Sequence, residues 1–295
     1  MKAIDSIKRA LDFIDDHVSE EIRISDLASH CYLSSFYFQR LFHETTGYSV
    51  EKYILYRRLA CAVIGLQEGE RVNKVAEKSG FKSPEHFSRV FKETYKMTPS
   101  DYRKEIAPLF HVYKPDVLLQ NARLNIGEKY VAYHMVLEIQ VREQEAISLI
   151  GVDIFCPFSI HDTGIDNPGV AWEKFHQVKH TIKHRVQPRH EFGISYNHKE
   201  DGYHYLAATV VTHIEDMPDD MVSLVLPKGK YVCCIYDNES FEEAVGPNLR
   251  SAMIYFEKWF KENKYKTAHN YVIESYNQDA FQAPFRIAIW ANVKP

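Results

Sequence analysis

The chain has 295 residues, of which 45% are hydrophobic and 26% charged, a composition typical of a globular protein with room for two ordinary domains. No apolar run approaches the ~18 residues that a membrane-spanning helix needs, and the start, MKAIDSIKRA, lacks the apolar core of a signal peptide. The five cysteines form no CxxC pair or regular framework, which is typical of reduced thiols. We therefore expect a cytoplasmic protein without a membrane partner.

The net charge of −4 argues against non-specific binding of nucleic acid, but the charge is unevenly distributed. Residues 1–110 contain 17 Lys and Arg against 16 Asp and Glu, a net of +1, and the remainder has a net of −5. A domain of charge +1 binds DNA only if its few cations are well placed.

The first hundred residues contain a repeat. SSFYFQRLFHET begins at residue 34 and SPEHFSRVFKET at residue 83, with identical residues at six positions offset by 49. A short apolar-periodic helix precedes each copy, with Ser25 and Asn73 as candidate N-caps and Gly80 allowing a tight turn in the second unit. Each unit therefore has the pattern helix, short turn, helix of a helix-turn-helix motif.

The second helix of each unit predicts an inner and an outer face. Phe38, Leu41 and Phe42 share an apolar face, as do Phe87, Val90 and Phe91. The outward positions are Ser35, Phe36, Gln39 and Arg40 in one unit, and Glu85, His86, Ser88 and Arg89 in the other. Because Arg pairs with guanine edges and Gln with adenine edges, these positions suit a major groove. An all-helical packing module with a duplicated hairpin is the alternative.

Residues 49–66 connect the two units and read as one helix of 18 residues, about 27 Å long. That length suits two reading helices in successive major grooves, about 34 Å apart.

Residues 1–106 resemble the DNA-binding domain of the AraC/XylS family of bacterial transcription regulators. The resemblance rests on SGF at 79–81, FSRVFKE at 87–93 and TPSDYRK at 98–104. It implies seven helices and monomeric binding to an asymmetric double-stranded DNA site, with the eight outward residues as contacts. Tyr32 departs from the family's usual turn glycine. Glu85 would repel phosphate but can accept a hydrogen bond from a cytosine amine.

The rest of the chain reads as a second domain with its own duplication. We place residues 1–107 in the first domain, 108–130 in a connector and 131–295 in the second domain. The expected elements are strands at 134–143, 146–155, 190–198, 203–213, 227–237, 270–277 and 284–293, with helices at 169–186 and at 240–263, the latter interrupted at Gly246-Pro247. Each half is thus strand, helix, strand, strand.

This second region resembles the GyrI-like effector-binding domain, on the basis of VREQEAISLIGVDI, LPKGKYVCCIYD and VIESYN. The fold class implied for the whole chain is multidomain: an all-α double helix-turn-helix domain followed by an α+β domain of duplicated β-α-β-β units, with two helices over an antiparallel sheet. The order of domains is similar to that of the Rob-type regulators. The resemblance implies a small-molecule site, often for cationic aromatic compounds, in which Glu274 meets the charge of the ligand.

Glu274 lies within an apolar strand. Aligning the two halves on their shared Ser-Tyr-Asn sets Ile194 against Glu274, which suggests a semi-buried position. A buried carboxylate is costly unless a partner compensates it, and a ligand cation between aromatic walls would do so. The candidate walls are Tyr196, Tyr276, Trp172, Phe175, Tyr255, Phe256 and Trp290. The alternatives are a solvent-facing Glu274 on an edge strand, or an internal pair with an Arg such as Arg286.

His176, His180 and His184 recur every four residues, but a helical wheel places them opposite the apolar side of their helix. We expect a solvated stripe, with a metal site as the alternative. We expect no cofactor, no metal and no catalytic residue.

The sequence thus predicts a transcription regulator, by expectation an activator, whose partners are double-stranded promoter DNA, a small-molecule effector and RNA polymerase. Two alternatives remain for the second domain. It could be a small-molecule hydrolase with Glu274 as base, or a protein-interaction module with no pocket.

Overall fold

A computed structural model describes residues 3–132, 135–158 and 164–294. The described residues group into two units. Unit 1 contains residues 3–118 together with 164 and 165, and unit 2 contains residues 119–158 and 166–294. The three-part division expected from the sequence stays a prediction. None of the described helices is long and apolar enough to cross a membrane.

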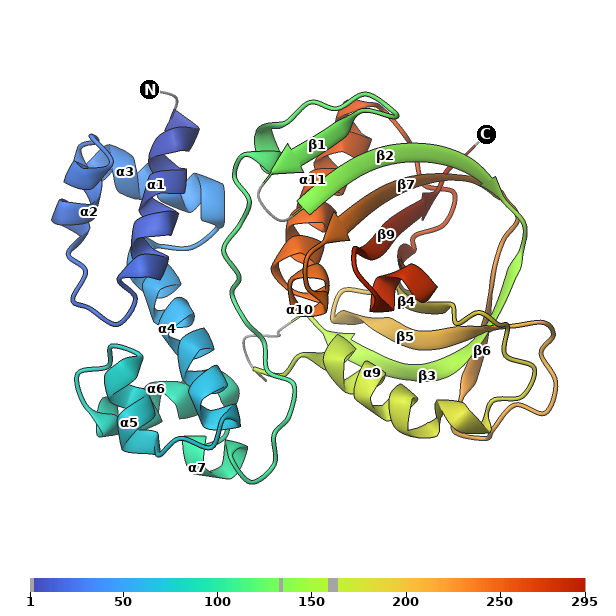
Figure 1. Ribbon diagram of the computed structural model, residues 1–295, viewed down its shortest axis with the longest axis horizontal. Helices are drawn as coiled ribbons and strands as arrows, with labels where there is room; N and C mark the ends of the chain where they lie inside the picture. The colour runs from blue at the N-terminus through green and yellow to red at the C-terminus, as the bar shows by residue number, and fades with distance from the viewer. Residues whose placement is uncertain (1–2, 133–134, 159–163, 295) are drawn as a thin grey trace. The chain divides into compact units, whose positions relative to one another are not determined.

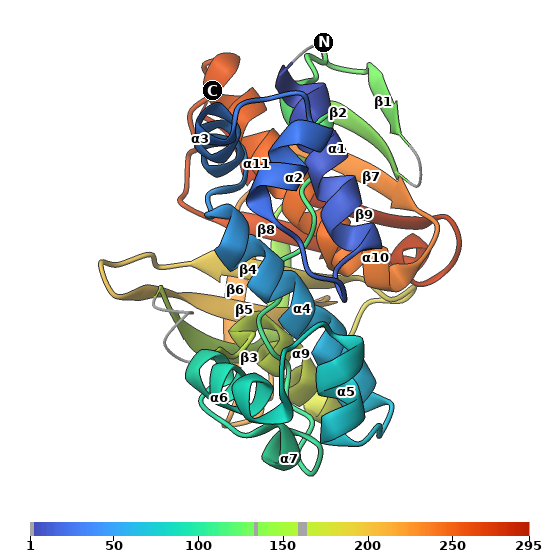
Figure 2. The ribbon, with the colours of Figure 1, turned by 90° about the vertical axis from the view of Figure 1, so that its left-hand side faces the viewer.

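Unit 1 is helical between residues 3 and 102 (Figure 1). Its helices are α1 (Ala3–Asp16), α2 (Ile24–His30), α3 (Ser35–Thr46), α4 (Val50–Gln67), α5 (Val72–Lys78), α6 (Pro84–Tyr95) and α7 (Pro99–Tyr102). The expected repeat is present, because α2–α3 and α5–α6 are the two helix pairs. Figure 2 shows α4 running between these pairs.

Unit 1 has two hydrophobic cores, and α4 contributes to both. Val50 and Tyr53 near the start of α4 pack with α1 to α3, whereas Leu59 and Val63 pack with α5 to α7. The predicted inner faces of the reading helices are confirmed, since Phe38, Phe42, Phe87 and Phe91 have no exposed surface. Two α-helical modules therefore share one rigid connecting helix.

The residues that cap the helix N-termini in unit 1 agree only in part with those predicted from the sequence. Ser34, Ser49 and Ser83 cap α3, α4 and α6 through their hydroxyls. The predicted caps Ser25 and Asn73 are wrong, because α2 and α5 begin earlier, after Arg23 and Arg71, without a side-chain cap.

The two helix-turn-helix turns use different residues for the same conformation. Tyr32 has φ of 57° and Gly80 has φ of 76°, so both lie in the left-handed region. Gly80 also packs against backbone, since an added Cβ would lie 2.8 Å from the Ser19 Cα atom and from the Val18 carbonyl oxygen. Tyr32 is 74% exposed, so the first turn meets the conformational demand without that crowding.

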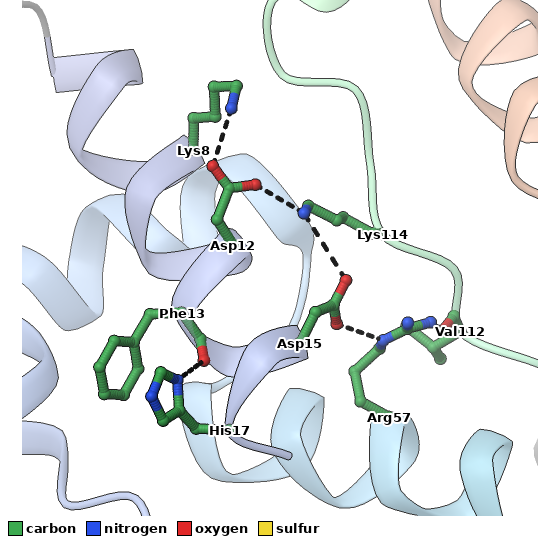
Figure 3. Close-up of polar contacts among 8 residues, drawn as sticks. All are labelled: Lys8, Asp12, Phe13, Asp15, His17, Arg57, Val112 and Lys114. Carbon is green, nitrogen blue, oxygen red and sulfur yellow. Dashed lines mark hydrogen bonds and ion pairs between the residues drawn. The ribbon is translucent and has the colours of Figure 1, made fainter. Parts of the chain in front are cut away.

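The chain after α7 folds back along unit 1 (Figure 3). Lys114 forms ion pairs with Asp12 at 2.6 Å and Asp15 at 3.7 Å, and Arg57 bridges Asp15 to the Val112 carbonyl oxygen at 2.9 Å each. Closer to α7, Leu109 pairs with Ile165 in an isolated β-bridge, and the Phe110 amide donates to the Gly164 carbonyl oxygen at 2.9 Å.

Unit 2 is built on a single antiparallel sheet of nine strands in the order β1-β2-β7-β9-β8-β4-β5-β3-β6. The strands are β1 (Lys129–Ala132), β2 (Met135–Gln144), β3 (Ile147–Pro157), β4 (Glu191–Tyr196), β5 (Gly202–Val211), β6 (Val222–Leu226), β7 (Gly229–Asn238), β8 (Val272–Tyr276) and β9 (Phe285–Asn292). The helices are α9 (Asn167–Val178), α10 (Phe241–Val245) and α11 (Pro247–Glu262), with single 3₁₀ turns at Leu119–Asn121, Lys179–Thr181 and Gln278–Phe281.

The duplication predicted from the sequence is visible in the strand order. If β2, β3, β4 and β5 correspond to β6, β7, β8 and β9, the order from β2 to β6 reads the same from either end. As part of this symmetry, β2 precedes β3 in the chain but pairs with β7, and β6 precedes β7 but pairs with β3. β4 and β8 meet at the centre, so neither is an edge strand.

The sheet is covered on both faces. The helices pack on one face, α9 on β3 and β5 and α11 on β7 and β9 (Figure 1). The opposite face has a core of its own that contains Phe192, Ile194, Ile273 and Trp290. We call these the helix face and the opposite face.

One expected helix boundary needs correction, and two strands were missed. The helix predicted at 169–186 ends at Val178, because Ile182 is buried in the core beneath α9 and Arg185 pairs with Val211 of β5. The short strands β1 and β6 were not predicted. The break at Gly246-Pro247 is confirmed between α10 and α11. His134, in the strand predicted at 134–143, lies outside the described residues.

Candidate functional site

The candidate reading face of α3 is open to solvent. Ser35, Phe36, Gln39 and Arg40 are all exposed, and Phe36 is exposed to 81%. A phenylalanine exposed to this degree gains nothing from folding within unit 1. Arg40 lies over the ring of Tyr37 at 5.4 Å and 3.8 Å from Glu44.

The corresponding face of α6 is more mixed. Glu85 and Arg89 are exposed, whereas His86 and Ser88 are half-buried. His86 packs edge-on against Phe81 at 5.9 Å, and its buried Nδ1 atom has no hydrogen-bond partner among the described residues. Arg89 contacts Glu93 at 3.1 Å, in the position of the Arg40–Glu44 pair in α3. Both pairs are exposed and hence weak, so either arginine is available to another partner.

Glu85 lies in the first turn of α6. A hydrogen bond from Ser83 and one from its own backbone lower the pKa of its carboxyl. Glu85 is therefore ionised at neutral pH and can act only as an acceptor.

Glu274 is buried in the interior of unit 2. Its relative exposure is 6%, and it lies in the central strand β8. This excludes a solvent-facing carboxylate on an edge strand. The proposed internal partner Arg286 forms a two-pronged pair with Asp237 instead, at 2.6 and 2.8 Å.

Ile194 and Glu274, which the Ser-Tyr-Asn alignment set against each other, point to different faces of the sheet and so do not occupy equivalent positions. In the ladder between β4 and β8, Gly193 lies directly opposite Glu274 and Ile194 opposite Ile273. Residues paired across strands point to the same face, so Glu274 points to the helix face and Ile194 to the opposite face. Gly193 has no side chain to occupy that space, and an added Cβ would lie 2.1 Å from the Tyr205 hydroxyl and 2.7 Å from Glu274 Oε2.

Two phenols and an indole surround the Glu274 carboxylate. Tyr205 and Tyr276 each donate a hydrogen bond to Oε2 at 2.8 Å. The Trp172 indole donates to the Tyr205 hydroxyl at 2.9 Å and packs edge-on against the Tyr276 ring at 5.2 Å. The helix α9 positions Trp172, β5 positions Tyr205, and β8 positions the other two residues.

The electrostatics of this cluster favour a positive ligand. Burial raises the pKa of Glu274 to about 7, although the two phenol hydrogen bonds oppose the shift, and the negative charge of Asp166 adds to it. Burial also raises the pKa of Asp166. No Lys, Arg or His forms an ion pair with Glu274 in the part of unit 2 that the structure describes.

The other expected ligand residues fall into two groups. Phe175 is buried beside Trp172 at 5.7 Å, and Tyr255 and Phe256 are buried in the helix-face core that also contains Tyr276. Tyr196 and Trp290 lie on the opposite face, where Tyr196 donates to Asp153 at 2.8 Å. The structure therefore brings Trp172, Phe175 and Tyr276 together near Glu274 and separates Tyr196 and Trp290 from it. Tyr205 and Gly193 were missed, because only strand pairing places them there.

Glu191 is a second buried carboxylate on the helix face. Lys179 at 2.8 Å, Arg189 at 2.6 Å and His176 at 3.6 Å surround it. Burial would raise its pKa, but these three partners lower it to about 2. Glu191 is thus satisfied internally.

The predicted histidine stripe does not continue along one helix, because α9 ends at Val178 and His184 has φ of 58°. His184 lies instead beside His213, with ring centroids 3.8 Å apart, and near Glu215. All three are exposed, and one ligand atom from each lies within 4.8 Å of the others, so a metal site here would use His184 with His213 and Glu215 rather than with His176 and His180.

Two family models match the chain. A helix-turn-helix domain matches residues 27–105, and a GyrI-like small molecule binding domain matches residues 137–294, just over half of the chain. Regulatory protein PocR of Salmonella typhimurium is 36% identical over 101 residues, which are 34% of this chain and 33% of PocR. Regulatory protein SoxS of the same organism is 35% identical over 101 residues, 34% of this chain and 94% of SoxS.

Among solved structures, an integron cassette protein of Vibrio cholerae is 16% identical with a TM-score of 0.40, covering 53% of this chain and 95% of that chain. That likeness is too low to add to the assignment, which rests on the sequence relatives. The chain spans a third of the length of PocR and nearly all of SoxS.

Duplicated helix-turn-helix units joined to a GyrI-like domain define the class as DNA-binding transcription regulators. The chain belongs to the AraC/XylS-type regulators and carries a C-terminal GyrI-like domain, so its two units imply DNA binding and small-molecule binding.

Proposed function

We propose that the chain is a one-component regulator in which a small cationic aromatic effector binds at Glu274 and changes the activity of unit 1 at a promoter. The observation that carries the proposal is a buried carboxylate held by phenols alone, beside a second acid, Asp166. A ligand cation would supply the missing counter-charge, and Trp172, Tyr205 and Tyr276 would form aromatic walls.

Access to Glu274 requires movement of Trp172. Its indole is bonded to Tyr205 and packed on Tyr276, so it occupies the space beside the carboxylate. Trp172 lies on α9, which begins at Asn167, two residues after Ile165 pairs with Leu109 in unit 1. A ligand that displaces Trp172 therefore has a covalent route to unit 1, provided that it binds one state of the chain more tightly than the other.

The effector proposal is tested with the three tryptophans replaced by 5-fluorotryptophan, each fluorine resonance being assigned by a Trp→Phe variant. Phenyltrimethylammonium should shift the Trp172 resonance saturably, and its neutral isostere tert-butylbenzene should bind more weakly. Glu274→Gln should abolish the difference between the two compounds. Equal binding of the cation by wild type and Glu274→Gln would remove Glu274 from the effector site.

We further propose that the eight outward residues of α3 and α6 contact an asymmetric DNA site: Ser35, Phe36, Gln39, Arg40, Glu85, His86, Ser88 and Arg89. The exposure of six of these residues, all but the half-buried His86 and Ser88, and the matched arginines support this. After selection of a site from random DNA, Arg89→Ala should weaken specific binding by about 1–3 kcal/mol. Lys78→Ala, on α5 and paired with Glu70, is the control and should bind as wild type.

The proposed sign of regulation is activation, with RNA polymerase as the second protein partner. Transcription in vitro from a promoter with the selected site, with purified polymerase, tests both. An increase in transcript on addition of the chain would support activation. A decrease would show that the chain represses transcription instead.

Catalysis is the second candidate for unit 2, because a carboxyl with a pKa near 7 suits a general base and two phenols stand beside it. Multiple turnover of an electrophile such as styrene oxide, lost in Glu274→Gln, would favour a hydrolase over a sensor.

A further inference from the structure

A polar groove of about 520 Å³ lies on the opposite face of the sheet, away from Glu274. Its floor is formed by outward residues of β2, β7, β8 and β9, among them Gln140, Ile235, Ser275, Ala288 and Trp290. The volume is within the range of small-molecule sites, and the mixture of apolar floor and polar walls is typical of them.

Arg142 is the distinctive residue of this groove. It is half-buried, and its guanidinium carbon lies 3.9 Å from the centroid of the Trp290 ring. Arg142 forms no ion pair with any residue that the structure describes, and its buried Nε atom has no hydrogen-bond partner there. Trp290 is only 3% exposed, and its buried Nε1 atom likewise has no hydrogen-bond partner in the described part of the chain. Both residues line the groove, although these two donor atoms are themselves covered from solvent.

The neighbours of Arg142 do not neutralise it. His190 shares a hydrogen bond with the Ser275 hydroxyl at 2.9 Å, and burial together with the Arg142 charge lowers the pKa of His190 to about 4. His190 is therefore neutral at physiological pH. The Cys233 thiol interacts with Arg142, but burial raises its pKa to about 11, so the thiol is uncharged as well.

The other end of the groove contains charges of both signs. Arg286 is neutralised by Asp237, and Glu138 accepts a hydrogen bond from Gln140 at 3.0 Å. Glu138 lies four residues from Arg142 along β2, about 13 Å at the rise of a strand. Lys129 also lines the groove and lies directly opposite Glu138 in the ladder between β1 and β2, so an anionic group is favoured most clearly beside Arg142.

We propose that this groove binds a small organic monocarboxylate, whose carboxylate pairs with Arg142 and whose ring or hydrocarbon lies on Ile235 and Ala288. A guanidinium stacked on an indole still presents its edge to a carboxylate, which it holds through two parallel hydrogen bonds. The site is independent of the proposed cation site at Glu274, since it lies on the other face of the sheet and selects the opposite charge.

The probe is phenylacetate, with neutral phenylacetamide as its isostere, added to the full chain carrying 5-fluorotryptophan at its three tryptophans. Phenylacetate should shift the Trp290 resonance saturably, and phenylacetamide should not. Arg142→Gln should weaken binding by about tenfold or more, because a charge-assisted pair is lost. Arg286→Gln, in the same groove but already paired, is the matched control and should bind phenylacetate as wild type.

The remaining resonances keep the test decisive. Unchanged Trp172 and Trp259 signals show that Arg142→Gln is folded. Arg142→Lys is a second variant, which keeps the positive charge but cannot form two parallel hydrogen bonds, and it should bind phenylacetate with intermediate affinity. No shift at Trp290, equal shifts for acid and amide, or undiminished binding by Arg142→Gln would each overturn the proposal. If phenyltrimethylammonium did not shift the Trp172 resonance, the proposal of a carboxylate site at Arg142 would still stand.

Discussion

Glu191 and Glu274 are buried carboxylates on the same face of two paired strands, and only Glu191 has cationic partners. Glu191 lies opposite Tyr276 and Gly193 lies opposite Glu274, so the two acids are diagonal neighbours. Hydrogen bonds with His176, Arg189 and Lys179 lower the pKa of Glu191 to about 2, whereas burial raises that of Glu274 to about 7. One acid therefore stabilises the fold, and the other is held at a cost that a ligand can relieve.

Replacing Glu274 by Gln should stabilise unit 2 at high pH. The native pKa of about 7 exceeds the usual 4.5, so the native state binds more protons than the unfolded state and the free energy of unfolding falls as pH rises from about 4.5 to about 7. Glutamine removes this loss, which amounts to about 3 kcal/mol at pH 8. Urea unfolding followed by tryptophan fluorescence measures it, since all three tryptophans lie in unit 2.

Glu191→Gln is the matched control and should act in the opposite direction. Its native pKa is lowered, so its contribution is fully present at neutral pH and is lost as pH falls towards about 2. The substitution should destabilise unit 2 by about 3 kcal/mol at pH 7, because Lys179 and Arg189 lose the carboxylate that they pair with. Stabilisation by both variants, or by neither, would contradict the contrast between the two acids.

Binding of a cation at Glu274 should release protons. Only the ionised carboxylate attracts a cation, and with a pKa of about 7 its ionised fraction rises about tenfold between pH 6 and pH 8. The affinity for phenyltrimethylammonium, which does not titrate, should rise by that factor. Calorimetry in two buffers of different ionisation enthalpy counts the protons released at pH 7. A pH-independent affinity would show that the cation does not contact this carboxylate.

The substitution Gly193→Ala should disturb the Glu274 cluster. The new Cβ would lie 2.1 Å from the Tyr205 hydroxyl, so the phenol must leave the carboxylate. We expect a loss of about 2 kcal/mol in the free energy of unfolding of unit 2. In a Tyr205→Phe background the same substitution should cost less, because the clashing oxygen is absent. An equal cost in both backgrounds would place the strain elsewhere.

Local patterns predicted unit 1 well. The repeated spacing of Phe38 and Phe42, and of Phe87 and Phe91, depends only on helical period, and the structure buries all four. The expected break in the last helix of unit 2 was also local, because Pro247 cannot continue α10.

The wrong predictions concern features that depend on pairing between segments far apart in the sequence. Matching the two halves on Ser-Tyr-Asn set Ile194 against Glu274, but the pairing of β4 with β8 turns these two side chains to opposite faces of the sheet. The helix predicted beyond Val178 gave way to pairing of Arg185 with β5. Tyr205 joins the carboxylate only because β5 lies beside β4, which no pattern within β5 reveals.

The two helix-turn-helix turns should respond differently to mutation. Gly80→Ala introduces both a strained left-handed residue and a Cβ 2.8 Å from backbone atoms of Ser19, so we expect a loss of about 3 kcal/mol in unit 1. Gly47→Ala is the matched control, because Gly47 has φ of 77° and no atom within 4 Å of the added Cβ. It should lose only about 1 kcal/mol, the cost of the conformation.

Tyr32→Gly should stabilise the first turn by about 0.5 to 1 kcal/mol, since it relieves the left-handed strain but loses the contact with Arg9 at 5.3 Å. In an Arg9→Ala background the gain should be larger, because that contact is already absent. Unit 1 contains no tryptophan, so amide hydrogen exchange of α3 and α6, resolved by mass spectrometry, is the suitable measurement. Equal losses for Gly80→Ala and Gly47→Ala would show that the backbone around Ser19 moves aside, and destabilisation by Tyr32→Gly in both backgrounds would show that the tyrosine ring supports the turn.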